Sequence, residues 1–183
     1  MEPIKIYTLA VLVENAAGVL SQVTRLFSRK GYNIESLAVG TTDEPSTSRI
    51  TIEIKTDEPH ARFLCNQLRK LLPVYSVKLL EGDNEIRREL VLVKVAAEGS
   101  ERRNQIIQIA NIFRASIIDV SQTTLTLAVI GAESKTEAIQ KLLSEFGILE
   151  MVRTGMVALE RGEHTINEAT KEKDEFDYGK NVL

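Results

Sequence analysis

The sequence predicts an α+β protein made of two small domains, each with the element order βαββαβ and an antiparallel sheet. Apolar segments with strand periodicity alternate with amphipathic segments of helical periodicity, and the same order of segments occurs twice along the chain. A polar linker at residues 81–86 separates the two occurrences. The 183 residues, 43% of them hydrophobic, are enough to form two small cores.

The first predicted strand covers residues 6–13, because this stretch is almost entirely apolar or β-branched and is too short for a typical helix. A helix is predicted over residues 19–30, where large apolar residues recur at helical spacing between polar ones, and Gly31 follows as its C-terminal stop. The stripe of this helix that is expected in the core consists of Leu20, Val23 and Phe27.

The next segments complete one βαββαβ unit. Residues 34–39 and 49–55 are predicted strands, the second with isoleucines on one face and polar residues on the other. Asp57 is suited to cap a second helix, which Pro73 follows, and residues 74–80 form a fourth strand. This order is typical of a ferredoxin-like fold, in which two helices cover one face of a four-stranded antiparallel sheet.

The second half repeats the pattern. A helix is predicted over residues 101–113, and another is expected to begin at a capping box formed by Ser134 and Glu137 and to end at Phe146. The expected strands of this half cover residues 89–96, 117–120, 124–130 and 148–159. The predicted organisation is a first domain at 1–80, a linker at 81–86, a second ferredoxin-like domain at 87–161 and a charged, flexible tail at 162–183.

Composition excludes several classes of function. The 23 basic and 26 acidic residues give a formal charge of −3, so the chain lacks the basic footprint of a nucleic-acid-binding protein. Cys65 is the single cysteine and lies among large apolar residues, which indicates a packed thiol and suits a reducing, cytoplasmic compartment. We also expect no export signal and no membrane partner, because no basic leader or apolar run of about 20 residues is present.

Catalytic and metal-binding motifs are missing from the sequence. The two histidines, His60 and His164, have no second ligand at metal-binding spacing and lie in segments where we expect solvated side chains. Neither a P-loop nor a G-x-G-x-x-G turn follows a predicted strand, so the sequence predicts no dedicated nucleotide site. Lys30-Gly31-Tyr32 is similar to part of an RNA-recognition motif, but it ends a predicted helix instead of lying on a sheet strand.

A small-anion site is predicted where the first strand turns into the first helix. The turn contains Asn15 and Gly18, and the first turn of a helix leaves backbone N–H groups without internal partners. Asn33 follows the other end of the same helix, so two amide side chains and a bare helix start are available to hold an amino acid. Structural roles are alternatives for each residue: a tight turn at Gly18, a helix cap at Asn15 and a left-handed turn at Asn33.

Two segments resemble a known family. They are Val13-Glu14-Asn15-x-x-Gly18-Val19-Leu20 and Arg29-Lys30-Gly31-Tyr32-Asn33-Ile34-Glu35-Ser36-Leu37, which are similar to the N-terminal ACT domain of acetolactate synthase (acetohydroxyacid synthase) small subunits. The resemblance continues through residues 48–52, 88–95 and 112–120, and it covers roughly residues 4–161. A glycine after a strand occurs in many ACT domains, whereas the Gly-Tyr-Asn-Ile-Glu-Ser segment is much more specific.

The resemblance implies a non-catalytic regulatory subunit of branched-chain amino acid biosynthesis. Such a subunit binds the large, thiamine-diphosphate-dependent catalytic subunit, raises its activity and transmits feedback inhibition by valine. Thiamine diphosphate, Mg²⁺ and FAD are expected on that catalytic partner, and this chain is expected to bind no cofactor or metal. In a homodimer or higher homo-oligomer the valine site is implied to comprise Asn15, Gly18, Val19 and Leu20 of one chain and Asn33 and Ile34 of another, with Ala17 and Ser21 in supporting positions.

The corresponding turn of the second half reads Ala97-Glu98-Gly99-Ser100-Glu101, where two acids should repel a ligand carboxylate. We hypothesise that this half serves in assembly or in contact with the catalytic subunit. Two other functions remain as alternatives: a stand-alone amino-acid-sensing ACT regulator of transcription, although the chain has neither a helix-turn-helix segment nor a basic patch, and a small enzyme on a ferredoxin-like fold, which fold alone does not exclude.

Overall fold

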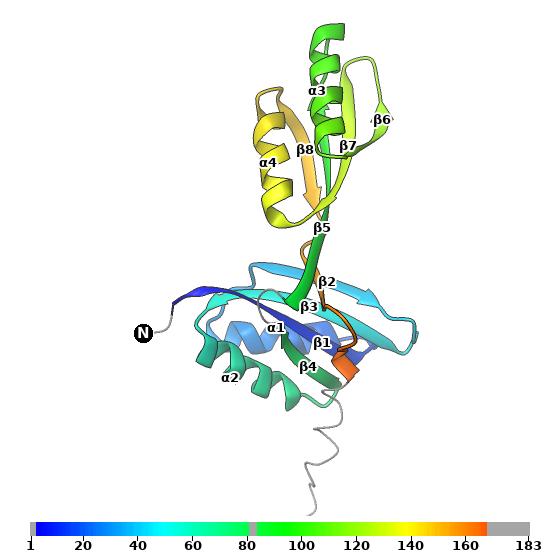
Figure 1. Ribbon diagram of the computed structural model, residues 1–183. Helices are drawn as coiled ribbons and strands as arrows, with labels where there is room; N and C mark the ends of the chain where they lie inside the picture. The colour runs from blue at the N-terminus through cyan, green and yellow to red at the C-terminus, as the bar shows by residue number, and fades with distance from the viewer. Residues whose placement is uncertain (1–2, 81–83, 168–183) are drawn as a thin grey trace, which may run out of the picture. The chain divides into compact units, whose positions relative to one another are not determined.

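The computed structural model describes residues 3–80 and 84–167, which form two compact units (Figure 1). The first unit contains residues up to Ile86 and again from Met156, and the second contains Arg87–Gly155. Each unit has two helices and an antiparallel sheet, so the predicted fold class is confirmed. No helix in the described residues is long and apolar enough to cross a membrane.

The first unit is built on a four-stranded sheet in the order β2-β3-β1-β4, with two helices packed on one face. Alternate residues of the strands, such as Val11 and its cross-strand partner Ile50, point into the core beneath the helices, where they meet Phe27 and Leu64. The elements of this unit are β1 (Lys5–Glu14), α1 (Val19–Lys30), β2 (Ser36–Thr41), β3 (Thr47–Thr56), α2 (Glu58–Arg69), β4 (Val74–Leu80) and β9 (Val157–Glu160).

A segment from the end of the chain lies on the other face of this sheet. We call residues 156–166 the return segment, because they come back to the first unit after the second. Its backbone is held by three side chains of the sheet: Ser36 Oγ accepts from Met156 N at 2.7 Å, Arg49 Nη2 donates to Ala158 O at 2.7 Å, and Ser76 Oγ donates to Ile166 O at 2.7 Å. These contacts reach strands β2, β3 and β4.

The return segment also buries apolar surface. Ala158 and Ile166 form a second small core with Ala10 and Leu80, against which Leu12 packs. The predicted polar face of β3 is therefore not a solvated face: Thr51, next to Ala10 in the sheet, is only 4% exposed.

The structure departs from the sequence prediction at this segment. A single last strand was expected over residues 148–159 within a domain ending at 161. Instead β8 ends at Arg153, Gly155 takes a positive φ of 80°, and the chain returns to the first unit from Met156. Residues 162–167, which were assigned to a flexible tail, include the buried Ile166. The rest of that predicted tail lies outside the described residues.

The second unit has strands in the order β6-β7-β5-β8, with β9 of the first unit pairing with β5, which spans both units. Both helices share one core with the inward faces of β5 and β7. The remaining elements are β5 (Glu85–Ala96), α3 (Ser100–Ile112), β6 (Ser116–Val120), β7 (Thr124–Gly131), α4 (Glu133–Ser144) and β8 (Ile148–Arg153).

The predicted capping box at the start of α4 is wrong. The helix begins at Glu133 after Ala132, and no side chain caps it. Thr136, which is fully buried, instead bonds through its Oγ1 to the carboxylate of Glu89, and Arg153 Nη1 reaches the same carboxylate at 2.9 Å. A tertiary contact between a strand and the helix thus replaces the local cap.

Two local predictions in the first unit are confirmed. Gly31 ends α1 in the left-handed conformation, with φ at 74°. Cys65 is buried in the core, and burial raises the pKa of its thiol to about 11, so the thiol stays protonated at neutral pH.

Asp57 caps α2 as predicted, because its Oδ1 accepts from His60 N at 3.0 Å. This backbone hydrogen bond, followed by the one from the His60 side chain, lowers the pKa of Asp57 below its ordinary value. A lowered folded-state pKa means that the stabilisation is fully present above the pKa of an unfolded aspartate, about 3.9, and is lost as the pH falls through the folded-state value.

We therefore expect Asp57→Ala to lower the urea midpoint at neutral pH, with the difference from the unchanged chain shrinking as the solution is made acidic. Asp57→Asn is the matched control, since asparagine caps helices but does not titrate. It should retain most of the neutral-pH midpoint and lose the acid dependence. An Asp57→Asn chain with the full acid dependence of the original would show that other carboxylates cause it.

Candidate functional site

The turn between β1 and α1 is shaped by a glycine in a conformation that other residues rarely adopt. Gly18 has φ at 85° and ψ at −10°, the left-handed region, and α1 begins at the next residue. A Cβ built on Gly18 meets no atom within 4 Å, so the backbone here faces open space. Gly18 therefore does form a tight turn, and this turn leaves room for a ligand against the backbone.

The N-terminus of α1 is open to an anion. No side chain caps it, and no backbone hydrogen bond within the described residues uses the N–H groups of Leu20 or Ser21. Its first turn also contains no acidic residue, whereas α2, α3 and α4 each have a glutamate there, at Glu58, Glu101 and Glu133. The positive end of the α1 dipole is thus left without a neutralising side chain.

Asn15 is held in place beside this helix start. Its backbone N–H donates to Ser46 O at 2.7 Å, and its Nδ2 donates to Pro45 O at 2.9 Å. The side chain is therefore not a helix cap, which rejects the structural alternative. The bond to Pro45 uses one of the two N–H groups of Nδ2 and leaves the carbonyl oxygen Oδ1 as the acceptor that Asn15 can offer to a ligand.

Asn33 and Ile34 lie at the opposite end of α1. Asn33 Nδ2 donates to Glu35 Oε1 at 3.0 Å, and Ile34 is partly buried against the core. Among the described residues only Arg114 is a non-glycine residue with positive φ, so Asn33 is not the left-handed turn residue of the structural alternative. The 12 residues of α1 separate the two ends by about 18 Å at 1.5 Å per residue, so one chain alone does not bring Asn15 and Asn33 together.

The predicted stripe of α1 needs one correction. Leu20 was expected in the core, but it is 41% exposed, and Val19, 4% exposed, is buried in its place. The side chain of Val19 is therefore not available at the turn, and its N–H donates to Ala16 O at 3.4 Å, whereas Leu20 offers an exposed side chain. Ala17 and Ser21 are exposed beside them.

The matching helix start in the second unit has the opposite character. Gly99 precedes α3, and a hollow of about 720 Å³ lies there, lined by the carboxylates of Glu98, Glu101 and Glu145. The nearby guanidinium of Arg102 is occupied, because it donates to Phe146 O at 2.5 Å and its Cζ lies 5.7 Å from the centre of the Phe146 ring. Three carboxylates around this helix start make it unsuitable for a ligand carboxylate, as the sequence predicted.

Comparisons with known families agree with the fold. A model described as the AHAS small subunit-like ACT domain matches residues 9–76, which include the Gly18 turn and Asn33. A second model, described as the small subunit of acetolactate synthase, matches residues 88–162. The chain is thus an ACT-domain protein in its first unit.

Relatives extend this match to most of the chain. The acetolactate synthase small subunit of Mycobacterium leprae is 47% identical over 156 residues, which are 85% of this chain and 92% of the relative. A probable acetolactate synthase small subunit of Methanothermobacter thermautotrophicus is 42% identical over 166 residues, 91% of this chain and 98% of the relative. The chain belongs to the family of acetolactate synthase small subunits.

A solved structure has the same architecture. The crystal structure of the acetolactate synthase small subunit from Thermotoga maritima matches with a TM-score of 0.82 at 36% sequence identity. The match covers 88% of this chain and 100% of that one. The fold of this chain is therefore shared by an acetolactate synthase small subunit of known structure.

Proposed function

We propose that this chain is the non-catalytic regulatory subunit of acetolactate synthase and that valine binds at the start of α1. In this role it activates the large catalytic subunit and confers feedback inhibition on branched-chain amino acid biosynthesis. Thiamine diphosphate, Mg²⁺ and FAD belong to the catalytic partner in this proposal. The observation that carries it is the uncapped, acid-free start of α1, which faces open space at Gly18 in a chain of this family.

The polar groups at the turn fit an amino acid. The N–H groups of Leu20 and Ser21 take the carboxylate, a contact with the helix dipole worth about 0.3 to 2 kcal/mol. The Oδ1 atom of Asn15 accepts a hydrogen bond from the ammonium group. Ala17 and the exposed side chain of Leu20 border the ligand's side chain. A pocket of this kind separates ligands that differ by one methylene by only about 1 to 3 kcal/mol, so discrimination against leucine is expected to be modest.

The topology of the sheet supports a site shared by two chains. Strand β2 is an edge strand that runs parallel to β1, because both are antiparallel to β3. If the β2 strands of two copies pair antiparallel about a two-fold axis, the start of one β2 lies at the end of the other. That arrangement brings Asn33 and Ile34 of the second copy to the sheet edge where β1 ends and the Gly18 turn begins.

Reconstitution with the large subunit tests this function. We expect added chain to raise acetolactate formation by the catalytic subunit and added valine to reverse that rise. The chain alone should not turn over pyruvate. If the catalytic subunit has the same activity with and without this chain, or if the isolated chain consumes pyruvate, the regulatory assignment is wrong.

A further inference from the structure

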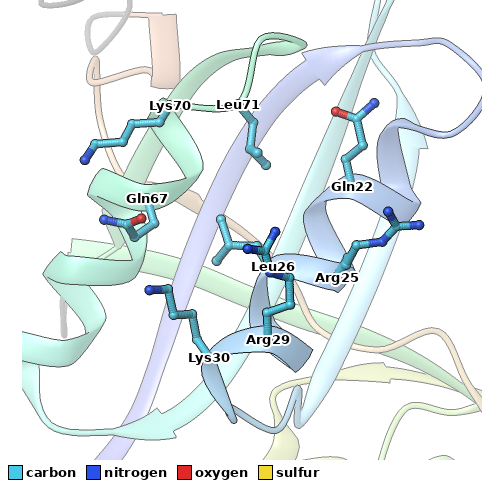
Figure 2. A pocket seen from close by; sticks show the side chains of 8 residues that line it. All are labelled: Gln22, Arg25, Leu26, Arg29, Lys30, Gln67, Lys70 and Leu71. Atoms are coloured by element: carbon cyan, nitrogen blue, oxygen red, sulfur yellow. The ribbon is translucent and has the colours of Figure 1, made fainter.

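A basic groove lies between the two helices of the first unit. It has a volume of about 350 Å³, and Figure 2 shows its lining side chains, which come from α1, from α2 and from the residues just after α2. Leu26 and Leu71 form an apolar floor, and both pack against the core below. The groove is therefore a built feature of the helix pair, with a floor fixed by the core.

Four cations line this groove: Arg25, Arg29, Lys30 and Lys70. No carboxylate is among the lining residues, and none of the four forms an ion pair within the described part of the chain. Lys30 instead has its Nζ 5.4 Å from the centre of the Phe63 ring. The structure thus corrects the expectation that the chain has no basic patch, because the helix pair gathers these four cations although the formal charge of the whole chain is −3.

The cations are spread along the groove. The two helices run antiparallel, as the contact between Tyr32 after α1 and His60 at the start of α2 shows, with ring centroids 6.2 Å apart. Lys30 therefore lies near one end and Lys70 near the other. On α1 alone, Arg25 and Lys30 are about 7.5 Å apart along the axis. Such a row suits several carboxylates spaced along an extended chain better than one compact anion.

Two other surfaces of the first unit are covered by the return segment or assigned to a second copy of the chain. The face of the sheet opposite the helices carries the return segment, and the β2 edge is the place for a second copy in the proposed function. Among the described residues, the groove on the helix face is lined by α1, α2 and the residues just after α2. A regulatory subunit must still contact its catalytic partner through some surface.

We infer that the α1–α2 groove docks an acidic surface segment of the large catalytic subunit. Carboxylates of that segment pair with the four cations, and its apolar side chains rest on Leu26 and Leu71. The glutamines of the groove, Gln22 and Gln67, supply both donors and acceptors for the backbone of the segment. This inference rests on the proposed function and assigns one contact surface for the catalytic subunit to the first unit, in addition to the contact role hypothesised for the second unit.

The test is activation of the large subunit by the full-length chain carrying Arg25→Glu and Arg29→Glu. We expect the concentration for half-maximal activation to rise about tenfold or more at low ionic strength, because reversed rim charges oppose association. The difference from the unchanged chain should narrow at high salt. Arg25→Gln with Arg29→Gln, which adds no repulsion, should give an intermediate shift, and circular dichroism checks that each variant is folded.

The matched control reverses two exposed lysines of the first unit that lie outside the groove, Lys5→Glu and Lys55→Glu, with the same change in net charge. It should activate like the unchanged chain. Equal weakening by the control, or an unchanged half-maximal concentration for the folded groove variant, overturns the docking site while the regulatory function stands. If the unchanged chain itself does not activate the large subunit, the proposed function fails and the docking site fails with it.

Discussion

Gly18→Asp is expected to weaken valine binding by at least about a hundredfold while leaving the chain folded. The new carboxylate lies where the carboxylate of valine is expected, and two like charges about 4 Å apart near a protein surface repel by about 4 kcal/mol. The backbone tolerates the change, because a Cβ at Gly18 meets no neighbour and aspartate is one of the few residues that adopt positive φ. Calorimetric titration with valine measures the loss.

Gly18→Asn is the matched control for this variant. Asparagine has the same shape and the same tolerance of the left-handed conformation, so both variants carry the same backbone strain of roughly 1 kcal/mol. Only aspartate adds charge. We expect the asparagine variant to bind valine much more tightly than the aspartate variant. Equal affinities of the two variants would mean that the turn matters through its shape and that the carboxylate binds elsewhere.

Removing the return segment is expected to destabilise the first unit by roughly 3 to 5 kcal/mol. A chain that ends at residue 155 loses the apolar contacts of Met156, Ala158 and Ile166 and the three hydrogen bonds made by Ser36, Arg49 and Ser76. It also exposes the previously covered face of the sheet, including Ala10 and Leu80. Such a loss is a large share of the stability of a small domain.

A chain that ends at residue 167 is the control for this truncation. It keeps the whole return segment and should unfold at a higher urea concentration than the chain that ends at residue 155. Its tyrosines, Tyr7, Tyr32 and Tyr75, all lie in the first unit, so their near-ultraviolet signal reports on that unit alone. Equal midpoints for the chains ending at 155 and 167 would show that the return segment contributes little.

The stability that the return segment is expected to give the first unit affects any deletion test of the second unit. Deleting residues 84–183 removes the second unit, but it also removes the return segment from the first. A loss of the valine response in such a deletion would then have two possible sources, the missing second unit and the destabilised first unit. Point variants in the second unit, which leave residues 156–166 in place, separate transmission from stability.

Much of the candidate site was predictable from sequence because it is local. The Gly18 turn follows directly from an apolar strand, a glycine and a helical repeat, and the start and end of α1 were predicted at the observed residues. The acid-free first turn of α1 and the acids around α3 are likewise visible in the sequence. Even the row of cations on α1, Arg25, Arg29 and Lys30, is a readable signal, although it passed unnoticed among the polar residues of an amphipathic helix.

Features that depend on distant residues were not predictable in the same way. The burial of Thr51 and the placement of Leu20 on the surface depend on which neighbours cover them, and the groove needs Lys70 to face α1 across a helix pair. The capping box at Ser134 had the right local pattern, yet the bond between Thr136 and Glu89 joins residues 47 positions apart. Tertiary contacts outweighed local preference there, since a cap is worth only about 1 kcal/mol.

The sequence by itself determined the βαββαβ order, the duplication, the family and the residues of the Gly18 turn, because strand and helix periods and turn residues act over a few neighbouring positions. Only the tertiary structure decided that the chain returns at Met156 to cover the first sheet, and that Leu20 lies on the surface while Val19 is buried. The physical reason is that burial and long-range hydrogen bonds depend on which segments meet in space, and hydrophobic pattern alone does not specify the partner.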